Sequence, residues 1–153
     1  TTQIDGNLDT STASFDDIQL IHNGVSTAKV VVAGNVTTHQ GGDILVWSDG
    51  GIDLSGVFMG SDDVSITALG QSAVIRGPIT ADVDGPGNGL IAYAAPFAQT
   101  KLHPTAVLTA PNVLLGFADN PTPLIQSLLG GWIGTNSISG VKSPSVAPCM
   151  LAK

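Results

Sequence analysis

The residues of this chain best suited to chemistry are aspartates, and one group of them lies in a glycine-rich stretch. From Asp82 to Gly89 the sequence reads Asp-Val-Asp-Gly-Pro-Gly-Asn-Gly, and its closely spaced oxygens are hard ligands of the kind that Ca²⁺ takes. Pro86 stands where a calcium loop needs a ligand, and no closing acid follows. A polar loop between two strands explains the same residues, so we predict no metal site and no cofactor.

A second group of carboxylates could serve glycoside hydrolysis, which needs two acids at a set separation, one of them with a raised pKa. Its members are Asp43, Asp49, Asp53, Asp62 and Asp63. All twelve acidic residues of the chain are Asp, and few aromatic residues are present to form a sugar platform. Because Asp is common at turns in any turn-rich β protein, we predict no catalytic residues and no enzyme.

The histidines and the cysteine indicate no further site. His22, His39 and His103 are far apart in the sequence, and none has a partner at a zinc-ligand spacing or the pattern of a catalytic triad. Cys149 is the only cysteine, which excludes an intrachain disulfide framework. Each histidine is explained more simply as a polar surface residue.

Two other features have equally simple explanations. The triplet Asn35-Val36-Thr37 fits the N-glycosylation pattern, but such triplets are frequent by chance. Trp47 and Trp132 are expected to be core or interface anchors rather than binding platforms.

The composition predicts a single domain made of strands and tight turns. A length of 153 residues suits one core, and the excess of Asp together with 19 Gly and 9 Pro disfavours helices. Charged residues make up 11% of the chain, and the net charge is −7 without any basic run. Duplex nucleic acid and anionic membranes are therefore excluded as partners, because both require clustered cations. No apolar run reaches the roughly 18 residues that cross a bilayer, so we expect a soluble chain.

The stretch from Gly41 to Ala81 contains three near-copies of one phrase, in which a turn residue precedes alternating apolar residues. The copies are Gly42-Asp43-Ile44-Leu45-Val46, Gly51-Ile52-Asp53-Leu54-Ser55 and Asp63-Val64-Ser65-Ile66-Thr67. This period of two is typical of a strand with one buried face. Ile44 and Val64 are twenty positions apart, and Val107 follows after forty-three more, about two further turns. A period near 20–25 residues with three short strands per turn predicts a short β-solenoid.

The alternative fold is a β-sandwich or jelly roll. In that fold Asn23-Gly24 and Asp49-Gly50 would be true hairpin turns. Asn-Gly between apolar runs is the strongest short hairpin signal, because both central residues of a type I′ turn need positive φ. We therefore expect a turn at Asn23-Gly24.

The chain divides into three regions. Residues 1–14 are predicted to form an extended arm, residues 15–120 a β-rich body, and residues 121–153 a short helix with an extended tail. The helix is expected from Leu124 to Leu129, stopped by Gly130-Gly131. The apolar segment from Leu124 to Ile133 is our predicted intersubunit contact.

The repeated phrases resemble the repeats of haemagglutinin-type secreted adhesins and the β-helical parts of phage tailspikes and trimeric capsid decoration (cement) proteins. The resemblance covers about residues 30–117 and is compositional. It implies a structural or attachment role without enzymatic activity. The implied partners are further copies of the chain in a homotrimer and the major capsid or other virion proteins, with the virion surface as the location.

Two other functions remain open. A carbohydrate-binding attachment module would need exposed aromatics, such as Trp47, Tyr93 or Trp132, beside Asp or Asn. A polysaccharide-active enzyme would need two Asp in one cleft. In the structural role, the functional surfaces are expected in the arm, in the loop from Asp82 to Gly89 and in the apolar tail.

Overall fold

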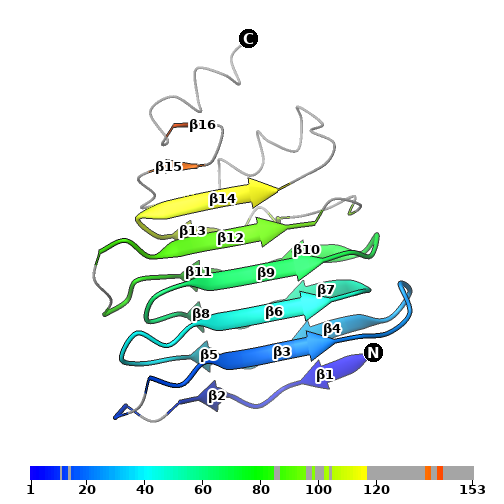
Figure 1. Cartoon of the computed structure of the whole chain (residues 1–153). Coiled ribbons are helices and arrows are strands. Elements are labelled where there is room, and N and C mark those ends of the chain that lie inside the picture. Colours follow the sequence, from blue (N-terminus) through cyan, green and yellow to red (C-terminus); the bar gives the residue numbers. More distant parts are fainter. Residues whose placement is uncertain are drawn as a thin grey trace.

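The computed structural model describes residues 1–10, 12–13, 15–84, 87–95, 98, 102–103, 105–116, 137–138 and 141–142. Within these residues the chain is all-β, and its strands form three sheets whose members lie one above another (Figure 1). Sheet A has the order β1 (Thr2–Ile4), β4 (Lys29–Val32), β7 (Gly51–Leu54), β10 (Ala73–Ile75). Sheet B has the order β13 (Val107–Thr109), β11 (Pro78–Thr80), β8 (Phe58–Met59), β5 (Val36–Thr37), β2 (Leu8–Asp9). Sheet C has the order β16 (Val141–Lys142), β15 (Ser137–Ile138), β14 (Asn112–Gly116), β12 (Leu90–Ala94), β9 (Val64–Ala68), β6 (Ile44–Ser48), β3 (Ile18–His22).

The chain passes through sheets A, B and C in turn and then returns to sheet A, and we call one such pass a circuit. All strand pairs of the described part are parallel except the last, β15 with β16. Ile44 pairs with Val64 twenty positions later, as the sequence period predicts. The circuits that contain longer loops are larger, since Val64 and its partner Ile91 are 27 positions apart. The parallel sheets are compatible with the predicted β-solenoid.

Two details of the prediction are wrong. Val107 is not equivalent to Val64, because it pairs with Pro78 in sheet B whereas Val64 lies in sheet C. The strands on either side of Asn23-Gly24 do not pair with each other: β3 pairs with β6, and β4 pairs with β1 and β7. Neither Asn23 nor Gly24 has the positive φ of a type I′ turn. The segment is a corner between two sheets, where the chain bends without reversing.

The same topology contradicts the sandwich alternative within the described residues. Asp49-Gly50 joins β6 in sheet C to β7 in sheet A, and each of these strands has parallel neighbours in its own sheet. A hairpin at this position would instead require antiparallel pairing of the two strands it connects.

Aliphatic columns fill the interior between the sheets. In sheet B the inward column runs through Leu8, Val36, Phe58, Ile79 and Leu108, which are stacked in register. Four of these five side chains are buried, and Leu8 of the first circuit is half-buried. Each circuit therefore covers its apolar side chains with those of the circuits above and below it.

Glycine occupies the corner between sheets A and B in successive circuits. A Cβ atom on Gly34 would lie 2.0 Å from the carbonyl oxygen of Gly6, one on Gly56 would lie 1.9 Å from that of Gly34, and one on Gly77 would lie 2.0 Å from that of Gly56. We call Gly6, Gly34, Gly56 and Gly77 the glycine ladder. The backbones approach so closely at this corner that no side chain fits between them.

The segment predicted to be an extended arm, residues 1–14, contains two short strands, β1 and β2. Within the segment expected to be an arm, β1 and β2 pair with β4 and β5, so both are parts of sheets A and B. The predicted helix, the apolar segment from Leu124 to Ile133, Trp132 and Cys149 lie outside the described residues. No helix long and apolar enough to cross a membrane is found in the part of the chain that the structure describes.

Candidate functional surfaces

The carboxylates Asp17, Asp43 and Asp63 stack at the corner where the chain enters sheet C. Their register follows from the pairing of the next residues, Ile18 with Ile44 and Ile44 with Val64. The Oδ1 atom of Asp17 accepts a hydrogen bond from the backbone N–H of Asp43 at 2.8 Å, and Oδ1 of Asp43 accepts one from N–H of Asp63 at 3.0 Å. Oδ1 of Asp63 accepts from N–H of Leu90 at 2.8 Å. These aspartates therefore join successive circuits, a structural role that the sequence did not reveal.

The stacking also raises the pKa of two carboxyl groups at this corner. The pKa of Asp43 is raised mainly because burial penalises its charged form, and the charges of Asp63 and Asp17 add to the effect. The pKa of Asp62 is raised by desolvation and by the charges of Asp63, Asp43 and Asp82. Like charges are held near one another in the folded state and are dispersed on unfolding.

We predict that mild acid stabilises the fold through this corner. A carboxyl whose pKa is raised by folding contributes stability that is fully present below its unfolded pKa and is lost as the pH rises through its folded pKa. The urea midpoint of the wild type should therefore be higher at about pH 4.5 than at neutral pH. Asp62→Asn should raise the midpoint at neutral pH and reduce this dependence, because it removes one of the clustered charges.

The matched control is Asp5→Asn, which changes the net charge equally but lies on the first circuit, outside the stacked corner. It should leave the pH dependence unchanged. If the Asp62→Asn variant and the wild type had the same urea midpoints at both pH values, the stacked carboxylates would not be the cause of the pH dependence.

The loop from Asp82 to Gly89 connects β11 to β12, as the simpler interpretation expects. Asp82 has a φ of 63°, and its Oδ1 accepts a hydrogen bond from the N–H of Gly87 at 3.0 Å, while the carboxylate of Asp84 accepts from the hydroxyl of Ser61. No group of three or more His, Cys, Asp or Glu side chains suited to a metal ion occurs among the described residues. The carboxylates of this loop thus bind the loop and its neighbouring circuit.

The five aspartates of the second group do not share one place. Asp43, Asp62 and Asp63 lie at the corner before sheet C. Asp53 lies in sheet A and binds the guanidinium of Arg76, with distances of 2.9 and 3.3 Å. Asp49 follows β6 at the corner between sheets C and A, and its Oδ1 accepts a hydrogen bond from the indole N–H of Trp47 at 3.0 Å.

The three histidines lie at three different corners of the circuits. His22 is the last residue of β3 in sheet C, and its Nδ1 is buried without a hydrogen-bond partner among the described residues. His39 lies after β5, with Nε2 at 2.9 Å from the carboxylate of Asp9. His103 follows the bridge of Leu102 to Ile75, and its Nδ1 lies 2.7 Å from the hydroxyl of Thr105. The structure does not bring them together.

Asn35 of the glycosylation triplet stabilises the corner between sheets A and B. Its N–H donates to Oδ1 of Asn7 at 2.9 Å, and its own Oδ1 accepts from the N–H of Val57 at 3.1 Å. Its side chain thus bridges two circuits, next to the glycine ladder.

The outer face of sheet C is an uncharged surface that the strand register defines. Two outward columns run across β3, β6, β9, β12 and β14 (Figure 1). We call them the sheet C face: Gln19, Leu45, Ser65, Ala92 and Leu114 in one column, and Ile21, Trp47, Thr67, Ala94 and Gly116 in the other. Neither column contains a charged residue, although the chain carries a net charge of −7.

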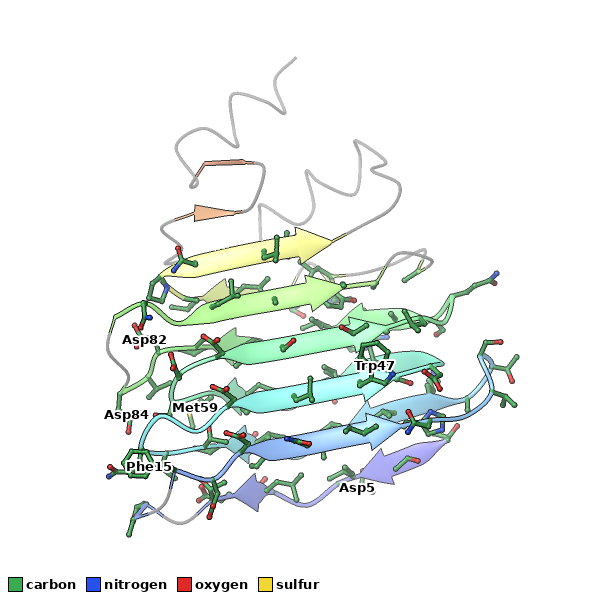
Figure 2. All side chains as sticks on the ribbon, viewed as in Figure 1. Asp5, Phe15, Trp47, Met59, Asp82 and Asp84 are labelled. Atoms are coloured by element: carbon green, nitrogen blue, oxygen red, sulfur yellow. The ribbon has the colours of Figure 1, made fainter. Side chains whose placement is uncertain are left out.

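The sheet C face is uneven, because large side chains project from it and small side chains leave a hollow. The side chains of Ile21 and Leu114 are exposed, at 53% and 39%, and Trp47 is 36% exposed and projects from the face (Figure 2). A shallow hollow of about 140 Å³ lies over the smaller residues of β9 and β12, and Leu114 of β14 borders it. The smaller residues are Ser65, Thr67, Ala92 and Ala94. Apolar side chains thus flank a depression that another apolar side chain could fill.

The aromatic residues differ in their exposure. Tyr93, unlike Trp47, points inward from β12, and its side chain is buried, which raises the pKa of its hydroxyl strongly. Of the aromatics named for a sugar site, Trp47 is therefore accessible and Tyr93 is not.

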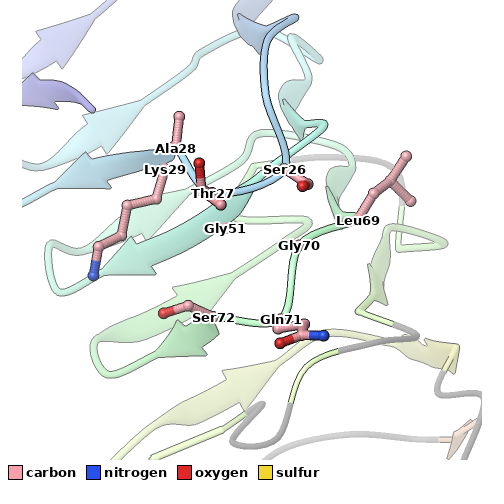
Figure 3. Close-up of a pocket in the computed structure, with 9 residues that line it drawn as sticks. All are labelled: Ser26, Thr27, Ala28, Lys29, Gly51, Leu69, Gly70, Gln71 and Ser72. Atoms are coloured by element: carbon pink, nitrogen blue, oxygen red, sulfur yellow. The ribbon is translucent and has the colours of Figure 1, made fainter.

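A notch lies at the corner between sheets C and A, at the opposite end of β6 from the stacked aspartates. It has a volume of about 540 Å³ and lies between the loop that contains Ser26, Thr27 and Ala28 and the loop from Leu69 to Ser72 (Figure 3). Lys29 and Gly51 also line it. No sequence pattern predicts this notch, because its shape depends on the unequal lengths of loops that become neighbours only in the coil.

Comparisons with protein-family models, with curated proteins and with solved structures found no match.

Proposed function

We propose that this chain is a non-enzymatic structural component of a virion, a capsid-decoration or tailspike-like protein that assembles as a homotrimer through the sheet C face. The location on a virion is the one implied by the resemblance of the repeated phrases to phage tailspikes and capsid decoration proteins. The observation that carries the proposal is the uncharged, largely apolar sheet C face on a chain with a net charge of −7. Elsewhere on the described surface, the acidic residues oppose close contact between copies.

The structure of the coil suits a rigid building block. The buried side chains form one continuous cluster that extends from the second circuit to β14. Hydrogen bonds from aspartate and asparagine side chains then fix one circuit to the next at the corners. We also propose that the coil is a β-solenoid, in which parallel strands stacked in register place their outward side chains in columns.

The size of the sheet C face decides what kind of assembly it can support. Five strands spaced about 4.8 Å apart, each five residues long, cover roughly 400 Å². A stable interface of standard size buries about 800 Å² on each partner, so one such contact is weak by itself. Closed symmetry and attachment at several points on a lattice add weak contacts together, which is how a decoration protein would hold a particle.

The proposal predicts that a charge on the sheet C face disrupts the trimer. Thr67 lies in register between Trp47 and Ala94 at the centre of the face, so Thr67→Lys would bury an unpaired ammonium in each contact. We expect the variant to be a monomer at concentrations where the wild type is a trimer, as measured by size-exclusion chromatography with light scattering.

The matched control is Thr80→Lys, the same substitution at an outward position of sheet B. It should leave the mass unchanged. A trimeric Thr67→Lys variant, or loss of the trimer in both variants, would refute the role of the sheet C face.

A second function, a carbohydrate-binding attachment module, is favoured by one observation. Trp47 is accessible and its indole is oriented by Asp49, an arrangement that can stack on a sugar and bind its hydroxyls. Binding of the wild type to a glycan array, lost in Trp47→Ala but retained in Thr67→Lys, would favour this function over assembly through the same face.

A further inference from the structure

The largest side chain of the sheet C face is Trp47 of β6. Its residue is 36% exposed, and the indole stands out from the strands (Figure 2). The indole N–H donates to Oδ1 of Asp49 at 3.0 Å, so the indole is held in one orientation before any contact is made. A side chain that is already ordered loses less conformational entropy when it is buried in an interface. Trp47 is therefore suited to be an anchor, the role in which tryptophan is enriched at interfaces.

The hollow on the same face lies beside Trp47. Thr67 and Ala94, which line the hollow, follow Trp47 in its own column on the next two strands of sheet C. Trp47 does not line the hollow, so its indole projects next to the depression and does not fill it. The residues that the structure describes thus leave a space of about 140 Å³ open beside an exposed indole.

The charge and the size of the sheet C face favour a second copy of the chain as the occupant of the hollow. Two such faces meet without repulsion because neither column contains a charged residue, although the chain carries a net charge of −7. A flat contact over the face would cover roughly 400 Å², half of a standard interface on each partner. Insertion of a tryptophan adds roughly 150–250 Å² of buried area to such a contact. Every copy of the face supplies both the indole and the hollow.

We propose that Trp47 of each copy inserts into the hollow of a neighbouring copy, which makes the hollow the anchor pocket of the assembly. The inference rests on the proposed assembly through the sheet C face and states how the copies interlock. The indole and the hollow are separate places on one face. Each copy therefore gives its indole to one neighbour and receives the indole of the other, as a closed trimer requires.

Two substitutions separate this interlock from a general attraction between apolar faces. Trp47→Ala removes the anchor, and Ala92→Leu fills the hollow from an outward position of β12. Ala92→Leu enlarges the apolar area, so it would strengthen a contact that depended on area alone. The interlock requires the opposite. Each variant should raise the concentration at which half of the chains are assembled by at least about tenfold, as measured by light scattering across a dilution series.

The matched controls are Phe15→Ala and Ala33→Leu, which change exposed residues outside the sheet C face. Figure 2 shows Phe15 at the opposite side of the view from Trp47. Both controls should assemble like the wild type. Circular dichroism identifies any variant that does not fold, and Ser65→Leu, which fills the same hollow from β9, then takes the place of Ala92→Leu.

A mixture of the two variants provides the decisive comparison. Trp47→Ala keeps the hollow and Ala92→Leu keeps the indole, so one chain of each kind can form a single interlocked contact. We expect native mass spectrometry to detect a pair with one chain of each variant at a concentration where each variant alone is a monomer. The insertion is overturned if Ala92→Leu assembles as well as the wild type, or if the mixture forms no such pair.

The mass of the wild type distinguishes failure of the insertion from failure of the proposed assembly. A wild type that forms a trimer, with Trp47→Ala and Ala92→Leu also trimeric, overturns the insertion alone. A wild type that forms a dimer, with both variants monomeric, supports the insertion and overturns only the trimer. A wild type that stays monomeric at every concentration overturns the assembly and the insertion with it.

Discussion

Replacing Gly56 with alanine is expected to destabilise the protein by more than about 3 kcal/mol, or to prevent folding altogether. The added Cβ would lie 1.9 Å from the carbonyl oxygen of Gly34, whereas carbon and oxygen normally approach to about 3.3 Å. The corner would have to open by more than an ångström. The hydrogen bonds from the backbone N–H groups of Ser55 and Gly56 to the carbonyl of Val32 would then be broken.

The same ladder supplies the control for this prediction. Gly6 occupies the equivalent corner of the first circuit, and a Cβ atom there would meet nothing within 4 Å. Gly6→Ala should change the free energy of unfolding by less than about 1 kcal/mol, and restriction of the unfolded chain can make the change stabilising. Urea denaturation followed by circular dichroism measures both variants. Similar midpoints for Gly56→Ala and Gly6→Ala would show that the circuits do not stack as closely as described.

The second large effect is expected at Phe58, in the centre of the sheet B column. Phe58 is completely buried between Val36 and Ile79 of the neighbouring circuits. Phe58→Ala should therefore cost about 3–5 kcal/mol, because it removes a buried ring and leaves a cavity that stacked strands cannot close.

The next residue on the same strand is the matched control. Met59 points outward from β8 and is half-buried (Figure 2), so Met59→Ala should cost less than about 1.5 kcal/mol. The free energies of unfolding from urea titrations give both values. A larger loss for Met59→Ala than for Phe58→Ala would mean that the inward and outward faces of sheet B had been assigned in reverse.

The strands and their spacing were predictable from the sequence because each strand has its own local pattern. The phrases that begin at Gly42 and Asp63 form β6 and β9, and Ile44 pairs with Val64 at the predicted spacing of twenty. The all-β class and the parallel stacking follow from the same period. The error at Asn23-Gly24 has a physical cause, since a bend between two sheets and a reversal within one sheet use the same turn residues.

The glycine ladder was also predictable from the sequence, but a search for runs of apolar residues overlooks its pattern. Gly6, Gly34, Gly56 and Gly77 each stand between inward apolar residues two positions before and two positions after, as in Ile4-Asp5-Gly6-Asn7-Leu8. An alignment of the chain on these glycines gives the circuits of sheets A and B directly. The stacked aspartates are less visible, because Asp before a strand is common whether or not its carboxylate binds the neighbouring circuit.

The candidate surfaces were not predictable, because each one depends on which residues become neighbours across circuits. The sheet C face combines Trp47 with Thr67 and Ala94, residues that share a column only once the register is fixed. It also lies partly within residues 41–81, outside the arm, the loop from Asp82 to Gly89 and the apolar tail, where the sequence predicts the functional surfaces. The notch requires the two-residue corner between β6 and β7 to lie between two longer ones, and no single segment of the sequence contains that information.

The central claim is that the sheet C face joins copies of the chain, and the mass of the wild-type protein in solution tests it most directly. Light scattering across a dilution series should give a particle three times the 15.4 kDa mass of the chain at high concentration. This particle should dissociate on dilution, as weak contacts of this size require. A β-rich protein that keeps the mass of a monomer at every concentration would contradict the claim.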